Sequence, residues 1–223
     1  MSSTPALVLA GCILTVGSIM IVSESDFRPV GDHSGYEPTQ PIEFSHRLHA
    51  GELAMDCLAC HYGAERSRHA GIPSASVCMG CHRQVTAGSD ATTSERLAAK
   101  RDGREPKRII SPKLRVLYET LGLDDNLDPV PGVEPRPIQW IRVHDLPDYA
   151  AFDHRVHVAR GLACQQCHGP VQTMERVRQE ASLSMGWCMD CHRSSPVRAD
   201  SAPPSSEDPR GEHVSTDCAR CHY

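Results

Sequence analysis

The hydrophobic positions of this chain are concentrated in one run near its beginning. Residues 1–23 carry no charged side chain, and residues 6–22 are almost wholly apolar. As a helix this run is about 25 to 30 Å long, which matches the hydrocarbon thickness of a bilayer. We therefore expect an N-terminal transmembrane anchor over 1–23. A cleaved signal peptide and a lipoprotein signal ending at Cys12 are the alternatives, and all three leave the remainder on the periplasmic or outer side of the cell membrane.

Beyond this run, apolar positions are sparse and predict only short elements. A helix is expected over residues 111–122, another starting at Ser94, and a third over 171–180. Residues 124–137 are rich in Pro and Asp and predict a loop, and no segment shows the alternation of a strand. The helix over 111–122 has the clearest signals, which are the cap Ser111, Pro112 in its first turn, the apolar positions Leu114, Leu117, Tyr118 and Leu121, and the terminator Gly122.

Large apolar residues are too few for an ordinary core. Leu, Ile, Val and Phe make up 43 of 223 residues, and eleven of these lie before residue 31. That composition approaches the range of disordered chains, but the formal net charge of −5 is too small for typical disorder. Something other than side chains is therefore expected to fill the interior. The charge gives no sign of nucleic-acid binding. The basic residues between 100 and 108 predict a solvated connector face, with partner docking as the alternative.

Ten of the eleven cysteines form five pairs of identical spacing, each followed directly by histidine. Two thiols three positions apart can form thioethers with the two vinyl groups of one porphyrin, and the adjacent imidazole then binds the iron. Zinc ribbons use pairs of cysteine pairs, and a disulfide framework does not need the histidine, so both explain the pattern less well. We predict five covalently bound c-type haems, at Cys57, Cys60 and His61; Cys78, Cys81 and His82; Cys164, Cys167 and His168; Cys188, Cys191 and His192; and Cys218, Cys221 and His222.

The first four motifs belong to two similar halves, each opened by the pattern F-x-H-x-x-H, which begins at Phe44 and again at Phe152. Imidazoles three positions apart share one helical face, so they can bind the irons of two different haems. We predict the opposite axial ligands to be His46, His49, His154 and His157. For the remaining iron the candidates are His144, His69 and Met185, with Met174 weaker. The alternatives are a hydrogen bond to a propionate for His69 and simple packing for Met174. Six-coordinate irons have no open position for a substrate, which favours electron transfer over catalysis.

These patterns divide the chain into seven segments around a predicted five-haem stack. The predicted fold class is a mainly α and irregular multihaem cytochrome c, with short helices and loops and little or no sheet. The segments are a transmembrane anchor (1–23), a polar linker (24–40), a first dihaem module (41–90), a connector with a helix (91–136), a second dihaem module (137–193), a Ser- and Pro-rich tether (194–212) and a C-terminal fifth haem (213–223).

Together with the five motifs, residues 41–49, 69–74, 137–147 and 183–193 resemble the pentahaem cytochrome c subunit of bacterial alternative complex III. The resemblance implies a membrane-bound subunit of a respiratory or photosynthetic complex that oxidises quinol. Electrons would arrive from a molybdopterin-enzyme-like iron–sulfur subunit, beside multispan quinone-binding subunits, and leave to a cytochrome c, a copper protein or an oxidase. Two other functions stay open. They are a freestanding quinol-dehydrogenase cytochrome feeding a periplasmic reductase, and a small reductase acting at an open haem.

Overall fold

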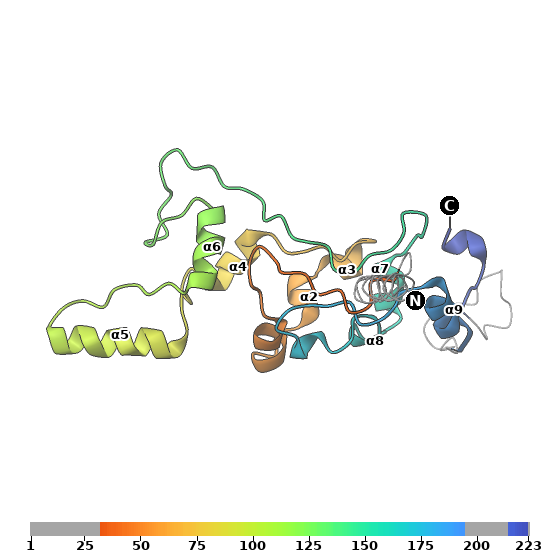
Figure 1. The fold of residues 1–223 in the computed structure, drawn as a ribbon, viewed down its shortest axis with the longest axis horizontal. Coiled ribbons are helices and arrows are strands. Elements are labelled where there is room, and N and C mark those ends of the chain that lie inside the picture. The colour runs from red at the N-terminus through yellow and green to blue at the C-terminus, as the bar shows by residue number, and fades with distance from the viewer. Residues whose placement is uncertain (1–31, 195–213, 223) are drawn as a thin grey trace, which may run out of the picture.

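Short helices joined by long irregular segments make up the computed structural model, which describes residues 32–194 and 214–222 (Figure 1). Within this part of the chain the β pairings are two isolated bridges, Leu123 with Pro129 and Ala150 with His222. The prediction of short helices and loops with little or no sheet is therefore confirmed there. The elements are η1 (Arg47–Glu52), α2 (Cys57–Cys60), α3 (Gly63–Arg66), α4 (Ala75–His82), α5 (Ser89–Asp102), α6 (Pro112–Thr120), α7 (His154–Ala159), α8 (Gln165–His168), η2 (Val171–Thr173), α9 (Met185–Ser194) and η3 (Cys218–Arg220).

Two predicted segments consist largely of residues that the structure does not describe. The anchor over 1–23 and most of the tether over 194–212 lie outside the described residues. A search of the described helices finds none with the length and apolar character to cross a bilayer.

The connector helix is present as α6 and begins and ends as its sequence predicts. The Ser111 hydroxyl accepts a hydrogen bond from the amide of Leu114, and proline occupies the first turn, where its missing N–H has no helical partner. Leu117 and Tyr118 are buried. Gly122 follows with a φ of 66°, a conformation that glycine adopts without strain. The helix expected from Ser94 is also confirmed, as part of the longer α5.

The main hydrophobic cluster of the described chain lies between α4 and α6. Its buried members are Met79, Leu117 and Tyr118, and partly buried residues such as Ile42 and Ile138 surround them. The Tyr118 hydroxyl donates a hydrogen bond of 2.5 Å to the carbonyl oxygen of His82. The cluster therefore holds α6 against the helix that carries the second cysteine motif.

The helix predicted over 171–180 is wrong. One 3-10 turn, η2, forms, and Met174 already has extended backbone with φ −90° and ψ 122°. The backbone groups beyond it are used by distant partners: Arg47 N–H donates to the Met174 carbonyl, and Gln179 N–H donates to the Tyr36 carbonyl. A backbone group that bonds a distant segment is not free to bond within a helix, so these tertiary contacts override the local preference.

The two modules are joined by two equivalent contacts. The η1 element of the first module packs on η2 of the second module, and α7 of the second module packs on α3 of the first. Each F-x-H-x-x-H element thus lies against the segment that follows the first cysteine motif of the other module. The close approach of η1 requires glycine at position 51, because a Cβ there would lie 2.3 Å from the carbonyl oxygen of Gln172. The elements spread along one long axis, with α5 at one end and η3 at the other (Figure 1).

Candidate haem sites

Each C-x-x-C-H motif is built on or beside a short helical turn. The first pair of thiols spans α2, and the second and fourth motifs lie within α4 and α9. Residues three and four apart share one face of a helix, so the two thiols and the imidazole of a motif are presented together. The ten described cysteines form no disulfide bonds. This donor set fits covalent attachment of a c-type haem.

Four pairs of imidazoles in the described chain have nearly the same separation. An imidazole nitrogen lies about 1.1 Å from its ring centroid and about 2.0 to 2.1 Å from a metal ion that it binds, so imidazoles on opposite sides of one iron have centroids about 6.3 Å apart. All four pairs match this value, and the residues therefore fit a six-coordinate haem at each. The pairs are His46 with His61 at 6.4 Å, His49 with His82 at 6.1 Å, His154 with His168 at 6.3 Å and His157 with His192 at 6.2 Å.

The pairing follows the same rule in both modules, and a phenylalanine ring supports it. The first histidine of F-x-H-x-x-H faces the first motif, and the second histidine faces the second motif. Phe44 stacks on His49 at 4.3 Å and meets His46 edge-on at 4.9 Å. Phe152 makes the same two contacts in the second module, at 4.5 and 4.8 Å. The repeat identified Phe44 and Phe152 only as markers; their role in holding two imidazoles apart is visible only in the structure.

Hydrogen bonds orient most of these rings. Because a carbonyl oxygen can only accept, each Nδ1 beside one must be the protonated nitrogen, which leaves Nε2 free for a metal. Seven imidazoles in the described part of the chain have this arrangement. They are His49 to Ser45 O at 2.9 Å, His61 to Gly71 O at 2.7 Å, His82 to Val85 O at 2.7 Å, His154 to Arg68 O at 2.8 Å, His157 to Asp153 O at 2.8 Å, His192 to Ser215 O at 2.9 Å and His222 to Tyr149 O at 3.2 Å.

Burial also favours the neutral imidazole that metal binding requires. It lowers the pKa of His168 to about 3, and the nearby His144, His154 and His61 add to the effect. It lowers the pKa of His46 to about 4, assisted by His61 and His49. Nδ1 of His46 and Nε2 of His144 are buried and have no hydrogen-bond partner among the described residues. Such atoms are the kind that a bound group satisfies.

His144 lies beside the third imidazole pair. Its ring meets His168 edge-on, with centroids 4.3 Å apart and planes at 84°. The position across from His168 is held by His154, whose ring is parallel within 5°. In this arrangement His144 is not the ligand opposite His168.

Gln179 fixes the backbone next to His144 and was missed by the sequence analysis. It is 0% exposed, and its side-chain oxygen accepts a hydrogen bond of 3.3 Å from the amide of Asp145. Its side-chain nitrogen donates to the carbonyl oxygens of Ala181 and Ser182. A single glutamine in a polar stretch has no periodic pattern, so no signal in the sequence could have revealed its burial.

The other candidate ligands face none of these imidazoles. His69 is exposed, Met185 is 63% exposed at the start of α9, and Met174 is buried between the modules. The ring of His222 stacks on Tyr149 at 5.9 Å. Among the described residues no second imidazole lies at the pair distance from His222, so its opposite ligand remains a sequence prediction.

The electrostatic influence of thiols in one motif on thiols in the next gives the five motifs an order in space. Burial is the first cause that raises the pKa of each thiol concerned, and a thiol of a neighbouring motif adds to it. These neighbours are Cys60 for Cys78, Cys164 for Cys57, Cys191 for Cys167 and Cys221 for Cys188. The order is therefore second, first, third, fourth and fifth motif, which Figure 1 shows as the succession α4, α2, α8, α9 and η3. The first motifs of the two modules meet at the centre.

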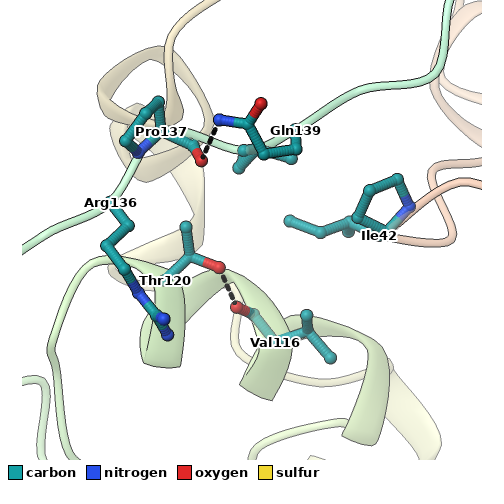
Figure 2. A pocket seen from close by; sticks show the side chains of 8 residues that line it. Ile42, Val116, Thr120, Arg136, Pro137 and Gln139 are labelled. Atoms are coloured by element: carbon teal, nitrogen blue, oxygen red, sulfur yellow. Dashed lines mark hydrogen bonds between the residues drawn. The ribbon is translucent and has the colours of Figure 1, made fainter.

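A pocket of about 390 Å³ lies beside α6, and no cysteine or histidine of a motif lines it (Figure 2). It is bounded by Ile42, by Val116 and Thr120 of α6, and by the segment 136–139. The Thr120 hydroxyl donates to the Val116 carbonyl at 2.7 Å, and Gln139 donates to the Pro137 carbonyl at 3.4 Å. The local polar groups thus bond each other within the wall of the pocket.

Comparisons with known proteins agree with this donor set. Residues 150–223 match the family model described as cytochrome c7 and related cytochrome c. The chain is also similar to the multihaem cytochrome c subunit of menaquinone reductase from Nitratidesulfovibrio vulgaris (strain Hildenborough), with 28% identity over 129 residues. That match covers 58% of this chain and 45% of the relative, so the chain spans about half the length of the relative that it matches.

Proposed function

We propose that this chain, a multihaem c-type cytochrome, binds five haems in one row and conducts electrons along them within a quinol-linked membrane complex. The observation that carries this proposal is the set of four imidazole pairs, with centroids 6.1 to 6.4 Å apart, distributed along a continuous row of motifs. The imidazoles of each pair would both hold the iron of one haem, which would suit electron transfer and leave no position for a substrate.

The residues of the chain set the conditions under which the haems work. The bound iron supplies one-electron chemistry, and its potential depends on axial ligands, hydrogen bonds and burial. The thiols fix each porphyrin to the backbone. The Nδ1 hydrogen bonds and the rings of Phe44 and Phe152 hold the imidazole planes, and the low pKa of His168 and His46 keeps those imidazoles unprotonated. A thiol in each motif lies near enough to a thiol of the next motif to influence its pKa or be influenced by it, so neighbouring haems would lie close together.

We further propose that the complex resembles alternative complex III. The four resembling stretches and the five motifs support this assignment, and the apolar run over 6–22 supports a membrane anchor with the haems on the periplasmic or outer side. Electrons would enter from an iron–sulfur subunit and leave to a cytochrome c, a copper protein or an oxidase. The fifth haem would take its opposite ligand from Met185 or His69.

In a second candidate function, electrons pass along the haem row in the opposite direction, towards a quinone. The relative from Nitratidesulfovibrio vulgaris is named as a subunit of a menaquinone reductase, and its similarity extends over 58% of this chain. A row of haems conducts either way, so the partners at its two ends decide the direction.

The test is mild detergent extraction of membranes that contain the full chain. The fraction with a haem-staining band of 24.4 kDa is examined by mass spectrometry and assayed for quinol:cytochrome c and menaquinone reductase activities. Co-purification with an iron–sulfur subunit and multispan subunits, together with quinol oxidation, supports the first proposal. Quinone reduction with such partners supports the second. A haem content below five per chain, or recovery alone without either activity, contradicts both.

A further inference from the structure

The helix α5 and the segment that returns from it form an arm over residues 88–110. The helix has 14 residues, which makes it about 21 Å long. Figure 1 shows it extending away from the other elements, at the α4 end of the molecule. A polar helix that leaves the body of a protein needs either bracing of its own or a partner to cover it.

Internal contacts brace one face of the arm. The Glu95 carboxylate accepts hydrogen bonds from the Arg104 guanidinium at 2.5 and 3.2 Å and from the Lys107 amide at 2.8 Å. Gly103 turns the chain with a φ of 62°, and Ala99 is 1% exposed beneath the returning segment. The arm is therefore held as a fixed unit without a hydrophobic core.

The opposite face of α5 presents one apolar side chain among cations. Leu97 is 59% exposed, Lys100 and Arg101 lie three and four positions after it on the same face, and Arg96 lies four positions before Lys100. Arg96, Lys100 and Arg101 are exposed and form no ion pair within the described chain. Residues 88–110 hold six basic and four acidic side chains, in a chain whose formal net charge is −5. The arm is thus a cationic projection on an anionic protein.

The base of the arm is fixed to the end of the haem row. Thr86, four residues after His82, donates through its hydroxyl to the Ile109 carbonyl at 2.6 Å and accepts through its carbonyl from the Ser111 amide at 2.9 Å. These bonds join the chain segments that enter and leave the arm. They lie a few residues after the second cysteine motif, which is the outermost motif at this end. Whatever the arm binds is therefore held near the second haem.

We propose that the Arg96, Leu97, Lys100 and Arg101 face of the arm docks the acidic surface of a redox protein that exchanges electrons with the second haem. The proposal rests on the proposed function, because it assigns a partner to one end of the haem row. Complementary charge steers such encounters and raises their rate, and a central apolar side chain stabilises the docked complex once water is excluded.

The test is stopped-flow reduction of the full haem-loaded chain by a reduced, acidic plant-type ferredoxin as the probe. In each encounter one electron leaves the [2Fe–2S] cluster and reduces one ferric haem. The variant Arg96→Glu/Lys100→Glu/Arg101→Glu should lower the second-order rate constant at least tenfold at low ionic strength and remove most of its salt dependence. The control Arg66→Glu/Arg160→Glu/Arg176→Glu, with the same change in net charge, should lower it less than threefold. Leu97→Ala should raise the ferredoxin concentration that gives the half-maximal reduction rate by a few fold. The dependence of the rate constant on ionic strength should not change.

Equal losses in the arm variant and the control would overturn the docking proposal. So would sedimentation showing that the arm joins two copies of this chain, with dimers lost in the arm variant alone. Reduction of every haem by dithionite is measured on the same samples. A chain that fails this step contradicts the proposed haem row, whereas full reduction with unchanged ferredoxin kinetics in the arm variant contradicts the arm alone.

Discussion

In both modules a phenylalanine ring separates two imidazoles, yet the surroundings of equivalent ligands differ. His61 donates its Nδ1 proton to the Gly71 carbonyl, whereas its counterpart His168 lies edge-on against His144. The ring of His82 donates to the Val85 carbonyl and the backbone carbonyl of His82 accepts from Tyr118 of α6, whereas the ring of His192 donates to the carbonyl of Ser215, just before the fifth motif. The repeat thus preserves the distances between ligands, and the modules differ in the groups behind those ligands. Haem potentials depend on such second contacts, so the row should have two unlike ends.

The largest expected effect comes from removing equivalent ligands in the two modules. His46→Ala and His154→Ala should each leave one of the five haems without its opposite ligand while its thioethers remain. Electron paramagnetic resonance should show about one fifth of the low-spin signal replaced by a high-spin signal in each variant. His33→Ala, at a histidine that lies 3.9 Å from the Asp145 carboxylate and is assigned to no haem, is the control and should leave the spectrum unchanged. A fully low-spin spectrum in either ligand variant would remove that pair.

Removing a buried side chain from the cluster between α4 and α6 should lower the stability of the first module alone. Leu117 is 3% exposed in the cluster that holds α6 on α4. Leu117→Ala should lower the free energy of unfolding by about 2 to 5 kcal/mol and lower the thermal midpoint. Val116→Ala, at a residue that is 39% exposed on the same helix, should have a much smaller effect. Equal effects of the two substitutions would show that α6 is not held by this cluster.

A buried amide distinguishes the second module. Gln179→Leu would leave the amide of Asp145 and the carbonyls of Ala181 and Ser182 without their partner, at a cost of about 1 to 3 kcal/mol. Because the neighbouring His144 touches His168, a redox titration should also show one haem potential shifted. Gln139→Leu, at an exposed position outside the cysteine motifs, is the matched control. A loss of stability with all potentials unchanged would restrict Gln179 to a structural role.

The smallest expected effect is a pH response of the arm, which follows the first module and has no counterpart described after the second. Hydrogen bonds from Arg104 and Lys107 lower the pKa of Glu95 from 4.5 to about 2. Since the pKa is lower in the folded state, the stabilisation is complete above pH 4.5 and is lost as the pH falls towards 2. Limited proteolysis within 88–110 should therefore increase over that window. Glu95→Gln should be cleaved equally at both ends of the window, and an unchanged pH response in that variant would exclude Glu95 as its source.

The candidate ligand residues, though not their pairing with particular motifs, could be predicted because their spacing along the chain is regular. Thiols at i and i+3 and imidazoles at i and i+3 have fixed relations on a helical turn, so the repeat identified the four histidines that now lie opposite four motif histidines. The α6 helix was also predictable, since its cap, its apolar face and its terminating glycine are all local. Assignments of these residues to particular irons stay predictions until haem spectra are measured.

The missed features depend on contacts between distant residues. Residues 174–180 are not helical because Arg47 and Tyr36, more than 120 residues earlier, bond the backbone of this segment. The burial of Gln179 arises from the same contacts. The order of the motifs could not be predicted either. The first motifs of the two modules are separated by 107 residues in the sequence, and they meet because η1 packs on η2 and α7 packs on α3.

The contacts of η1 with η2 and of α7 with α3 also determine which parts of the chain must be present before both modules can close. The ring of His154 is oriented by the Arg68 carbonyl, which is made 86 residues earlier, whereas Arg47 at the start of η1 bonds the carbonyl of Met174, which is made 127 residues later. A chain that ends before the second module contains its first two cysteine motifs but lacks the Met174 carbonyl that Arg47 bonds. Closure of the first module therefore requires residues as far along the chain as 174.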